Sequence, residues 1–148
     1  MRSLFLASAL ILGSLYPAMA QDIIKVNTNK AVQETMDALE ATAQKAGATI
    51  FARVDHAAGA KKVGMSIPAN QLLIFGNPAL GTPAMEIDPQ AGLFLPLKVQ
   101  VYEDSEGQVW LAYEDPKETM KDLDNVDKSP VIEKMRGVLA KLTSKAAQ

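Results

Sequence analysis

The chain has 148 residues, no cysteine, and 15 basic against 17 acidic residues, which gives a net charge of −2. One hydrophobic core, and hence one domain, is expected at this length. The missing cysteines exclude disulfides, iron–sulfur clusters and cysteine-ligated zinc, and the mildly acidic balance argues against non-specific nucleic-acid binding.

The first twenty residues have the pattern of a secretory leader. Arg2 precedes an apolar run over residues 4–15, and residues 18–20 have the small-x-small form of a cleavage site. The run holds about 12 apolar residues, short of the ~20 that a spanning helix needs, so a membrane anchor is the less favoured alternative. We expect cleavage between Ala20 and Gln21 and export to the periplasm or beyond. Residues 21–148 then keep 14 basic and 17 acidic residues, a net charge of −3.

The predicted domain begins with a strand over residues 22–26 and a helix over residues 30–46. Asn27, Thr28 and Asn29 supply side chains that can cap this helix, and Gly47 suits the position after its end. Apolar residues recur along one helical face: Val32, Met36, Leu39 and Ala43.

Three elements are predicted in the middle of the chain. Residues 48–54 alternate, which places Ile50, Ala52 and Val54 on one face of a second strand. A loop or single helical turn follows over residues 55–62, and the apolar run 72–75 is typical of a central strand covered on both faces. After a turn over residues 76–81, Thr82 caps a helix that starts at Pro83 and ends near residue 88.

A hairpin is the clearest unit of the sequence. Strands over residues 97–104 and 108–113 flank a loop in which Gly107 suits a left-handed conformation. Asp115 and Pro116 start a short helix, and Ser129-Pro130 starts the last one, so residues 116–146 are C-terminal helices. This order predicts an α+β fold with two layers, a mostly antiparallel sheet with helices packed on one face.

The stretch from Phe75 to Pro83 holds two glycines and two prolines, so it specifies one backbone path. Gly76 and Gly81 have the spacing of a phosphate-binding P-loop, but its lysine is missing and the prolines remove two backbone donors. Free N–H groups at the start of the next helix could still hold a small anion or carboxylate. The alternative is a strand–turn–helix corner whose glycines serve packing only.

His56 is the only histidine of the chain, which excludes zinc sites that need several. It could ligate one metal ion or haem, or serve as a hydrogen-bonded structural residue. A small hydrolase or isomerase would use His56 as base, although the adjacent Asp55 is poorly placed to orient the ring. Copper binding through Met65, Met85 and His56 is another alternative.

Two further groups of residues suggest binding. The pairs 103–104 and 114–115 are carboxylates at strand ends, which could meet to bind calcium or act as acid and base, or could serve turns and helix caps. Trp110, Tyr102 and Gln100 are expected on the sheet face away from the core. There they would form a patch for a homodimer or another protein partner.

Four segments in order resemble a known family: residues 50–58, 72–78 with 81–83, 95–99, and Tyr113 with Asp115-Pro116. They are similar to the domain of unknown function 302 over about residues 24–117. The resemblance implies a compact α+β domain and carries no established activity. After Pro116 the chain has residues 117–120 where members often have an Arg-His pair. The matching signature positions are Asp55, His56, Phe75, Gly76, Asn77, Pro78, Gly81, Thr82 and Pro83.

These features predict a non-catalytic exported binding domain. Two loops would converge on one pocket for a small ligand, an anion or a metal-bearing group, with His56 as the titratable contact and Asn77 as a hydrogen-bonding side chain. The predicted ligand-binding residues are Asp55, His56, Phe75, Gly76, Asn77, Gly81 and Thr82.

Overall fold

The computed structural model describes residues 23–148, so the expected leader and its cleavage site lie outside the described residues. Five strands form one sheet in the order β1-β5-β4-β3-β2, and every neighbouring pair is antiparallel. The strands are β1 (Ile23–Thr28), β2 (Thr49–Asp55), β3 (Asn70–Gly76), β4 (Leu97–Glu103) and β5 (Val109–Glu114). The helices are α1 (Val32–Lys45), α2 (His56–Lys62), α3 (Pro78–Ile87), the short 3-10 helix η1 (Pro89–Leu93), α4 (Pro116–Thr119) and α5 (Pro130–Ala147).

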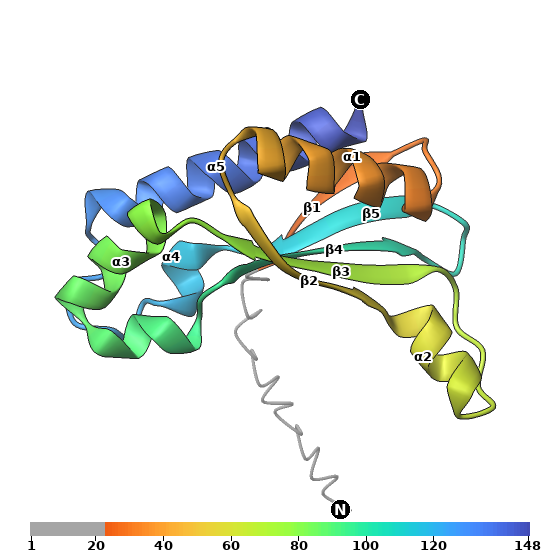
Figure 1. Ribbon diagram of the computed structural model, residues 1–148, viewed down its shortest axis with the longest axis horizontal. Helices are drawn as coiled ribbons and strands as arrows, with labels where there is room; N and C mark the ends of the chain where they lie inside the picture. Colours follow the sequence, from red (N-terminus) through yellow and green to blue (C-terminus); the bar gives the residue numbers. More distant parts are fainter. Residues whose placement is uncertain (1–22) are drawn as a thin grey trace, which may run out of the picture.

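The two long helices, α1 and α5, lie side by side on one face of the sheet (Figure 1). The predicted α+β fold with helices on one face is therefore confirmed. At one end of the sheet α2 projects below it, and α3 and α4 gather at the other end (Figure 1). Within residues 23–148, none of the helices combines the length and the hydropathy needed to cross a bilayer.

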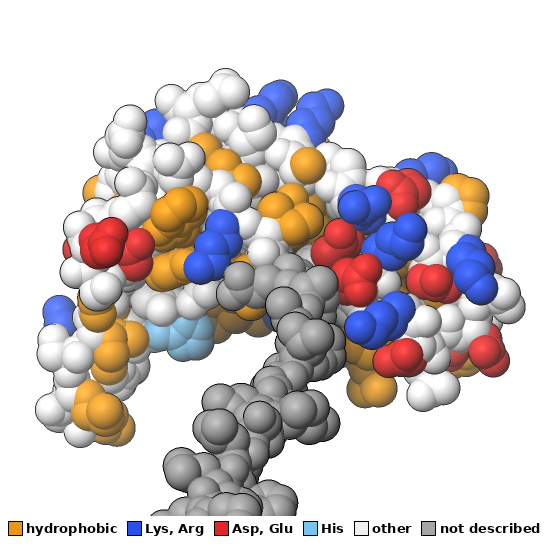
Figure 2. Space-filling model, turned by 180° about the vertical axis from the view of Figure 1, so that it is seen from behind, with side chains coloured by type: hydrophobic (Ala, Val, Ile, Leu, Met, Phe, Trp, Pro, Cys, Tyr) orange, Lys and Arg blue, Asp and Glu red, His pale blue; other side chains and the backbone are white. Residues whose placement is uncertain are grey.

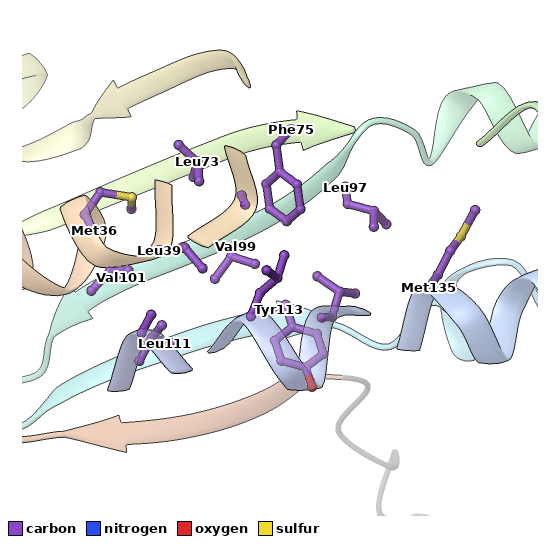
Figure 3. Packing of buried hydrophobic residues seen from close by; sticks show 14 of the residues in the cluster. Met36, Leu39, Leu73, Phe75, Leu97, Val99, Val101, Leu111, Tyr113 and Met135 are labelled. Carbon is purple, nitrogen blue, oxygen red and sulfur yellow. The ribbon is translucent and has the colours of Figure 1, made fainter. Parts of the chain in front are cut away.

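The core lies between the sheet and these two helices. Side chains of β3, β4 and β5 point from the sheet toward α1 and α5, as Figure 3 shows. The helical face predicted for α1 is buried, as are Val131, Met135 and Leu142 of α5. Burying each large apolar side chain contributes about 1.5–3 kcal/mol, so this interface is the main source of stability.

The second strand departs from simple alternation because it contains a β-bulge. Ile50 pairs with Phe75 on the core side, but after the bulge it is Arg53 that pairs with Leu73 there. Ala52 and Val54 pair with Ile74 and Leu72, so they lie on the open face. The prediction that Ile50, Ala52 and Val54 share one face is therefore wrong, because one extra residue reverses every later side chain.

Two helix starts also differ from the prediction. Ala31, not a residue of 27–29, precedes α1 at the N-cap, and the Thr28 hydroxyl instead donates to the carbonyl of Ala147, 2.9 Å away. Helix α3 begins at Pro78 with Asn77 as its N-cap, so Thr82 and Pro83 lie inside the helix. The predicted start at Pro83 is wrong, because the earlier cap and proline already begin the helix.

The other predicted elements agree with the structure more closely. Strand β3 is flanked by β4 and β2, but only one face is fully covered: Leu73 and Phe75 are buried, whereas Leu72 and Ile74 are half-buried. The predicted hairpin is β4–β5, with Gly107 at φ 82°. The carboxylate of Asp115 accepts from the backbone N–H of Lys117 at 3.0 Å, which confirms the cap of α4.

Candidate functional site

The two predicted ligand-binding loops lie at opposite ends of the β2–β3 pair. These strands are antiparallel, so Asp55 at the end of β2 pairs with Gln71, whereas Gly76 at the end of β3 pairs with Thr49. Gln71 and Gly76 are five steps apart along β3, which is roughly 17 Å at ~3.3 Å per step. Figure 1 accordingly shows α2 and α3 at opposite ends of the sheet. The prediction of one shared pocket is therefore wrong.

At the first end, Asp55 and His56 are exposed and begin α2. The Asp55 carboxylate accepts from the backbone N–H of Ala58 at 2.8 Å, so it caps the helix instead of orienting the imidazole. A catalytic role for His56 stays a prediction, and the Asp55 carboxylate serves the helix cap. Met65 follows α2 whereas Met85 belongs to α3, so the copper site proposed from Met65, Met85 and His56 is not assembled.

The carboxylate pairs also lie apart. Glu103 pairs with Val109 at one end of β5, and Glu114 is the last residue of that strand. Over residues 23–148, no group of three or more His, Asp or Glu side chains is arranged to hold a metal ion. The alternative in which the two pairs meet to bind calcium or act as acid and base is therefore wrong, and Asp104 and Asp115 serve a turn and a helix cap.

Asp104 illustrates that structural use. Its carboxylate accepts from the Trp110 indole N–H at 2.8 Å and from the backbone N–H groups of Glu106 and Gln108 at 2.9 Å. The bond from Trp110 is the largest cause that holds the pKa of Asp104 below its ordinary value, and the backbone bonds add to it. Asp104 thus fixes the hairpin loop and the ring of Trp110.

The Trp110 patch lies where the sequence predicted it, on the sheet face away from α1 and α5. Tyr102 pairs directly with Trp110, and their strand neighbours Val101 and Leu111 are buried on the other face. The Lys25 amine lies 5.7 Å from the centre of the Tyr102 ring, a cation–π distance. A role of this patch in a homodimer or partner complex stays a prediction.

A groove of about 270 Å³ lies beside α3, at the end of the β2–β3 pair opposite Asp55 and His56. Four predicted residues line it, and its lining surface is almost wholly apolar. Its walls come from distant parts of the chain: the β2 bulge, α3, the segment before β4, and α5. The predicted residues in the lining are Gly76, Asn77, Gly81 and Thr82, and the further apolar ones include Phe51, Leu80, Met85, Leu95, Pro96 and Met135.

Three glycines set how closely the groove walls approach. A Cβ on Gly76 would lie 3.3 Å from Cε2 of Phe51 and 3.4 Å from Cβ of Pro96. A Cβ on Gly81 would lie 3.4 Å from Cδ1 of Leu95, and one on Gly92 would lie 3.4 Å from Sδ of Met85. A Cβ on Gly76 would press on the Phe51 ring, whereas one on Gly81 or Gly92 would just touch its wall, so a side chain larger than alanine at these positions would enter the groove or displace a wall.

Asn77 holds the corner at which the groove begins. Its Oδ1 accepts from the N–H of Ala79 at 2.9 Å, and its Nδ2 donates to the carbonyl of Gly47 at 3.1 Å. The N–H groups of Leu80 and Gly81 donate to the Asn77 carbonyl, and Pro78 has none to offer. The expectation of free N–H groups for an anion at this helix start is therefore wrong.

Phe75 is the remaining predicted residue, and it belongs to the core. Its side chain is 1% exposed and points toward α1 and α5 (Figure 3). The sequence reading missed Phe51 and Leu95, which form walls of the groove. One signal for Leu95 was the apolar run over residues 93–97 in a segment expected to be a loop.

The chain is similar in sequence to parts of longer proteins. The chain has 42% identity over 105 residues to "Fluoride-specific ion channel FluC 1" of Brucella suis, which covers 68% of this chain and 41% of that protein. FluC 2 of Brucella melitensis matches with the same identity and length over 39% of its own chain. The chain thus spans about two fifths of the curated relatives it matches.

A solved structure shares the fold. The crystal structure of an uncharacterized conserved protein DUF302 from Bacillus stearothermophilus superposes with a TM-score of 0.70 at 17% identity, covering 86% of this chain and 97% of that one. The family model described as domain of unknown function DUF302 matches residues 24–142, and so includes α4 and most of α5. The chain therefore belongs to the DUF302 family.

Proposed function

We propose that this chain is a small exported binding domain whose groove beside α3 takes a small, mainly apolar molecule or side chain. The observation that supports this proposal is the apolar groove of about 270 Å³, which has glycines at three points of its wall. Its size exceeds the ~150 Å³ of an apolar cavity that binds benzene and falls just below the ~300 Å³ at which small-molecule pockets begin. A ligand the size of a substituted ring would fit.

Several features support an apolar ligand over an anion. The N–H groups that begin α3 already have acceptors, and the Asn77 side chain bonds at both of its ends. Met85 and Phe51 are 39% and 60% exposed, and both line the groove. Burial of these two side chains by a ligand would provide the driving force for binding.

A pair of matched glycine substitutions tests the groove. Gly81 lies in α3 and lines the groove, whereas Gly59 lies in α2, where an added Cβ would meet nothing within 4 Å. We expect wild type and Gly59→Leu to increase the fluorescence of the uncharged apolar probe N-phenyl-1-naphthylamine, and Gly81→Leu to bind it at least ~10-fold more weakly because its side chain fills the groove. Equal binding by Gly81→Leu and Gly59→Leu, both shown to be folded by circular dichroism, would reject the proposal.

The match to the Brucella proteins favours a second role. We propose that the domain serves an ion channel as an accessory unit, since the match leaves about three fifths of those proteins to other sequence. Removal of the matched segment from the Brucella suis protein should then alter fluoride resistance in cells that depend on that protein. Unchanged resistance with equal protein levels would argue against an accessory role.

A further inference from the structure

The segment from α2 to Ile67 is a cationic protrusion with exposed apolar side chains. Helix α2 has seven residues and buries none of them. In the five residues that follow, Val63, Met65 and Ile67 are 72%, 64% and 40% exposed. In Figure 1 α2 projects away from the covered face of the sheet, and Figure 2 shows hydrophobic side chains gathered on this projection near the single histidine.

The charge of this segment is opposite to that of the domain. Lys61 and Lys62 form its last helical turn, and the sequence has no acidic residue from His56 until Glu86. Residues 21–148 as a whole have a net charge of −3. Two lysines beside three exposed apolar side chains match the surface of an anionic bilayer, where amines bind lipid phosphates and apolar groups enter the headgroup boundary.

The turn that ends α2 pairs two of its backbone donors within the protrusion. Gly64, at φ 75°, ends α2 in a Schellman motif: the N–H of Met65 donates to the carbonyl of Ala60 at 3.0 Å, and the N–H of Gly64 donates to that of Lys61 at 3.1 Å. These peptide groups therefore carry no unpaired donor into the interface, where an unsatisfied donor would oppose insertion.

We propose that Lys61, Lys62, Val63, Met65 and Ile67 form an anchor that docks the domain on an anionic lipid surface. The inference goes beyond the groove, because it uses residues at the other end of the β2–β3 pair. It is compatible with an accessory role at a channel but does not depend on it. A second copy of the chain is a poorer occupant, because two tips with the same positive charge repel each other.

Vesicle flotation tests the anchor with a chain that begins at Gln21. We expect that chain to keep the fold, because the match covers 97% of the Bacillus stearothermophilus structure, which therefore consists of this domain. We expect the protein to float with phosphatidylcholine vesicles that contain phosphatidylglycerol, more weakly with pure phosphatidylcholine, and less in high salt. Lys61→Glu/Lys62→Glu should weaken binding to the anionic vesicles at least ~10-fold.

The apolar contribution has its own variant and control. Val63→Ser/Met65→Ser/Ile67→Ser should also weaken binding at least ~10-fold, whereas Leu93→Ser should not, although Leu93 is 81% exposed in η1 at the other end of the sheet. No flotation with anionic vesicles, or equal loss in Leu93→Ser, would overturn the proposal. A monomer–dimer equilibrium in sedimentation that the triple variant abolishes would assign the tip to a second copy, and would overturn it too.

Discussion

The two ends of the β2–β3 pair carry the family signature in two different ways. At one end, β3 runs through the buried Phe75 into α3, whose Ala84 is fully buried, and the corner forms a groove. At the other end, β2 runs into α2, which buries nothing and projects into solvent. A signature that is split between two distant corners need not describe one site; here each half contains a side chain that caps the next helix, Asp55 for α2 and Asn77 for α3.

The largest expected difference between the two ends is in global stability. Phe75→Ala should lower the free energy of unfolding by about 3–5 kcal/mol, because it leaves a cavity in the core. Met65→Ala should change it by less than ~0.5 kcal/mol, because the side chain is largely exposed. Urea unfolding of both variants measures this, and a comparable loss in Met65→Ala would show that the protrusion packs against the domain in solution.

The two residues that cap α3 and α2, Asn77 and Asp55, should also differ in their contribution to global stability, but by less than Phe75 and Met65 do. Asn77→Ala removes the cap of α3 and the bond to Gly47, so it should lower the free energy of unfolding by ~1–2 kcal/mol. Asp55→Ala removes the cap of a helix without buried residues. It should increase amide hydrogen exchange within α2 while global unfolding changes little. Equal shifts of the urea midpoint in both variants would contradict the proposed independence of α2.

The sequence predicted the features that depend on local pattern. The apolar stripe of α1 is a core face, Gly107 does adopt the left-handed turn, and Asp115 does cap α4. These outcomes need only spacing and turn chemistry. The same holds for the α+β class, which follows from the order of the elements.

The wrong predictions concern features that depend on contacts between residues far apart in the sequence. Asn77-Pro78 and Thr82-Pro83 are equivalent cap-and-proline signals, and the first begins the helix because Asn77 also bonds to Gly47. The bulge near Phe51 follows from how β2 pairs with β3, which no local pattern shows. The shared pocket failed for the same reason, since antiparallel pairing of those strands places their two following helices at opposite ends.

The smallest expected effect on stability concerns the ion pairs that join the middle of β2 to α1. The Arg53 guanidinium donates to Asp37 of α1 at 2.6 Å and to Glu40 at 3.2 Å. The bond from Arg53 is the largest cause that lowers the pKa of Asp37 from its ordinary 3.8, with the bond from Gln33 and the charge of Arg53 adding to it. The folded protein therefore binds this proton less readily than the unfolded chain.

The stabilisation by Asp37 should thus be present above pH ~4 and be lost as the pH falls through its lowered pKa. Its size should stay below ~1 kcal/mol, because the Asp37 side chain is 55% exposed and solvent screens the pair. Urea unfolding of wild type and Asp37→Asn from pH 6 to pH 3 should show a difference that shrinks with acid, and a difference that is constant with pH would remove Asp37 as the cause.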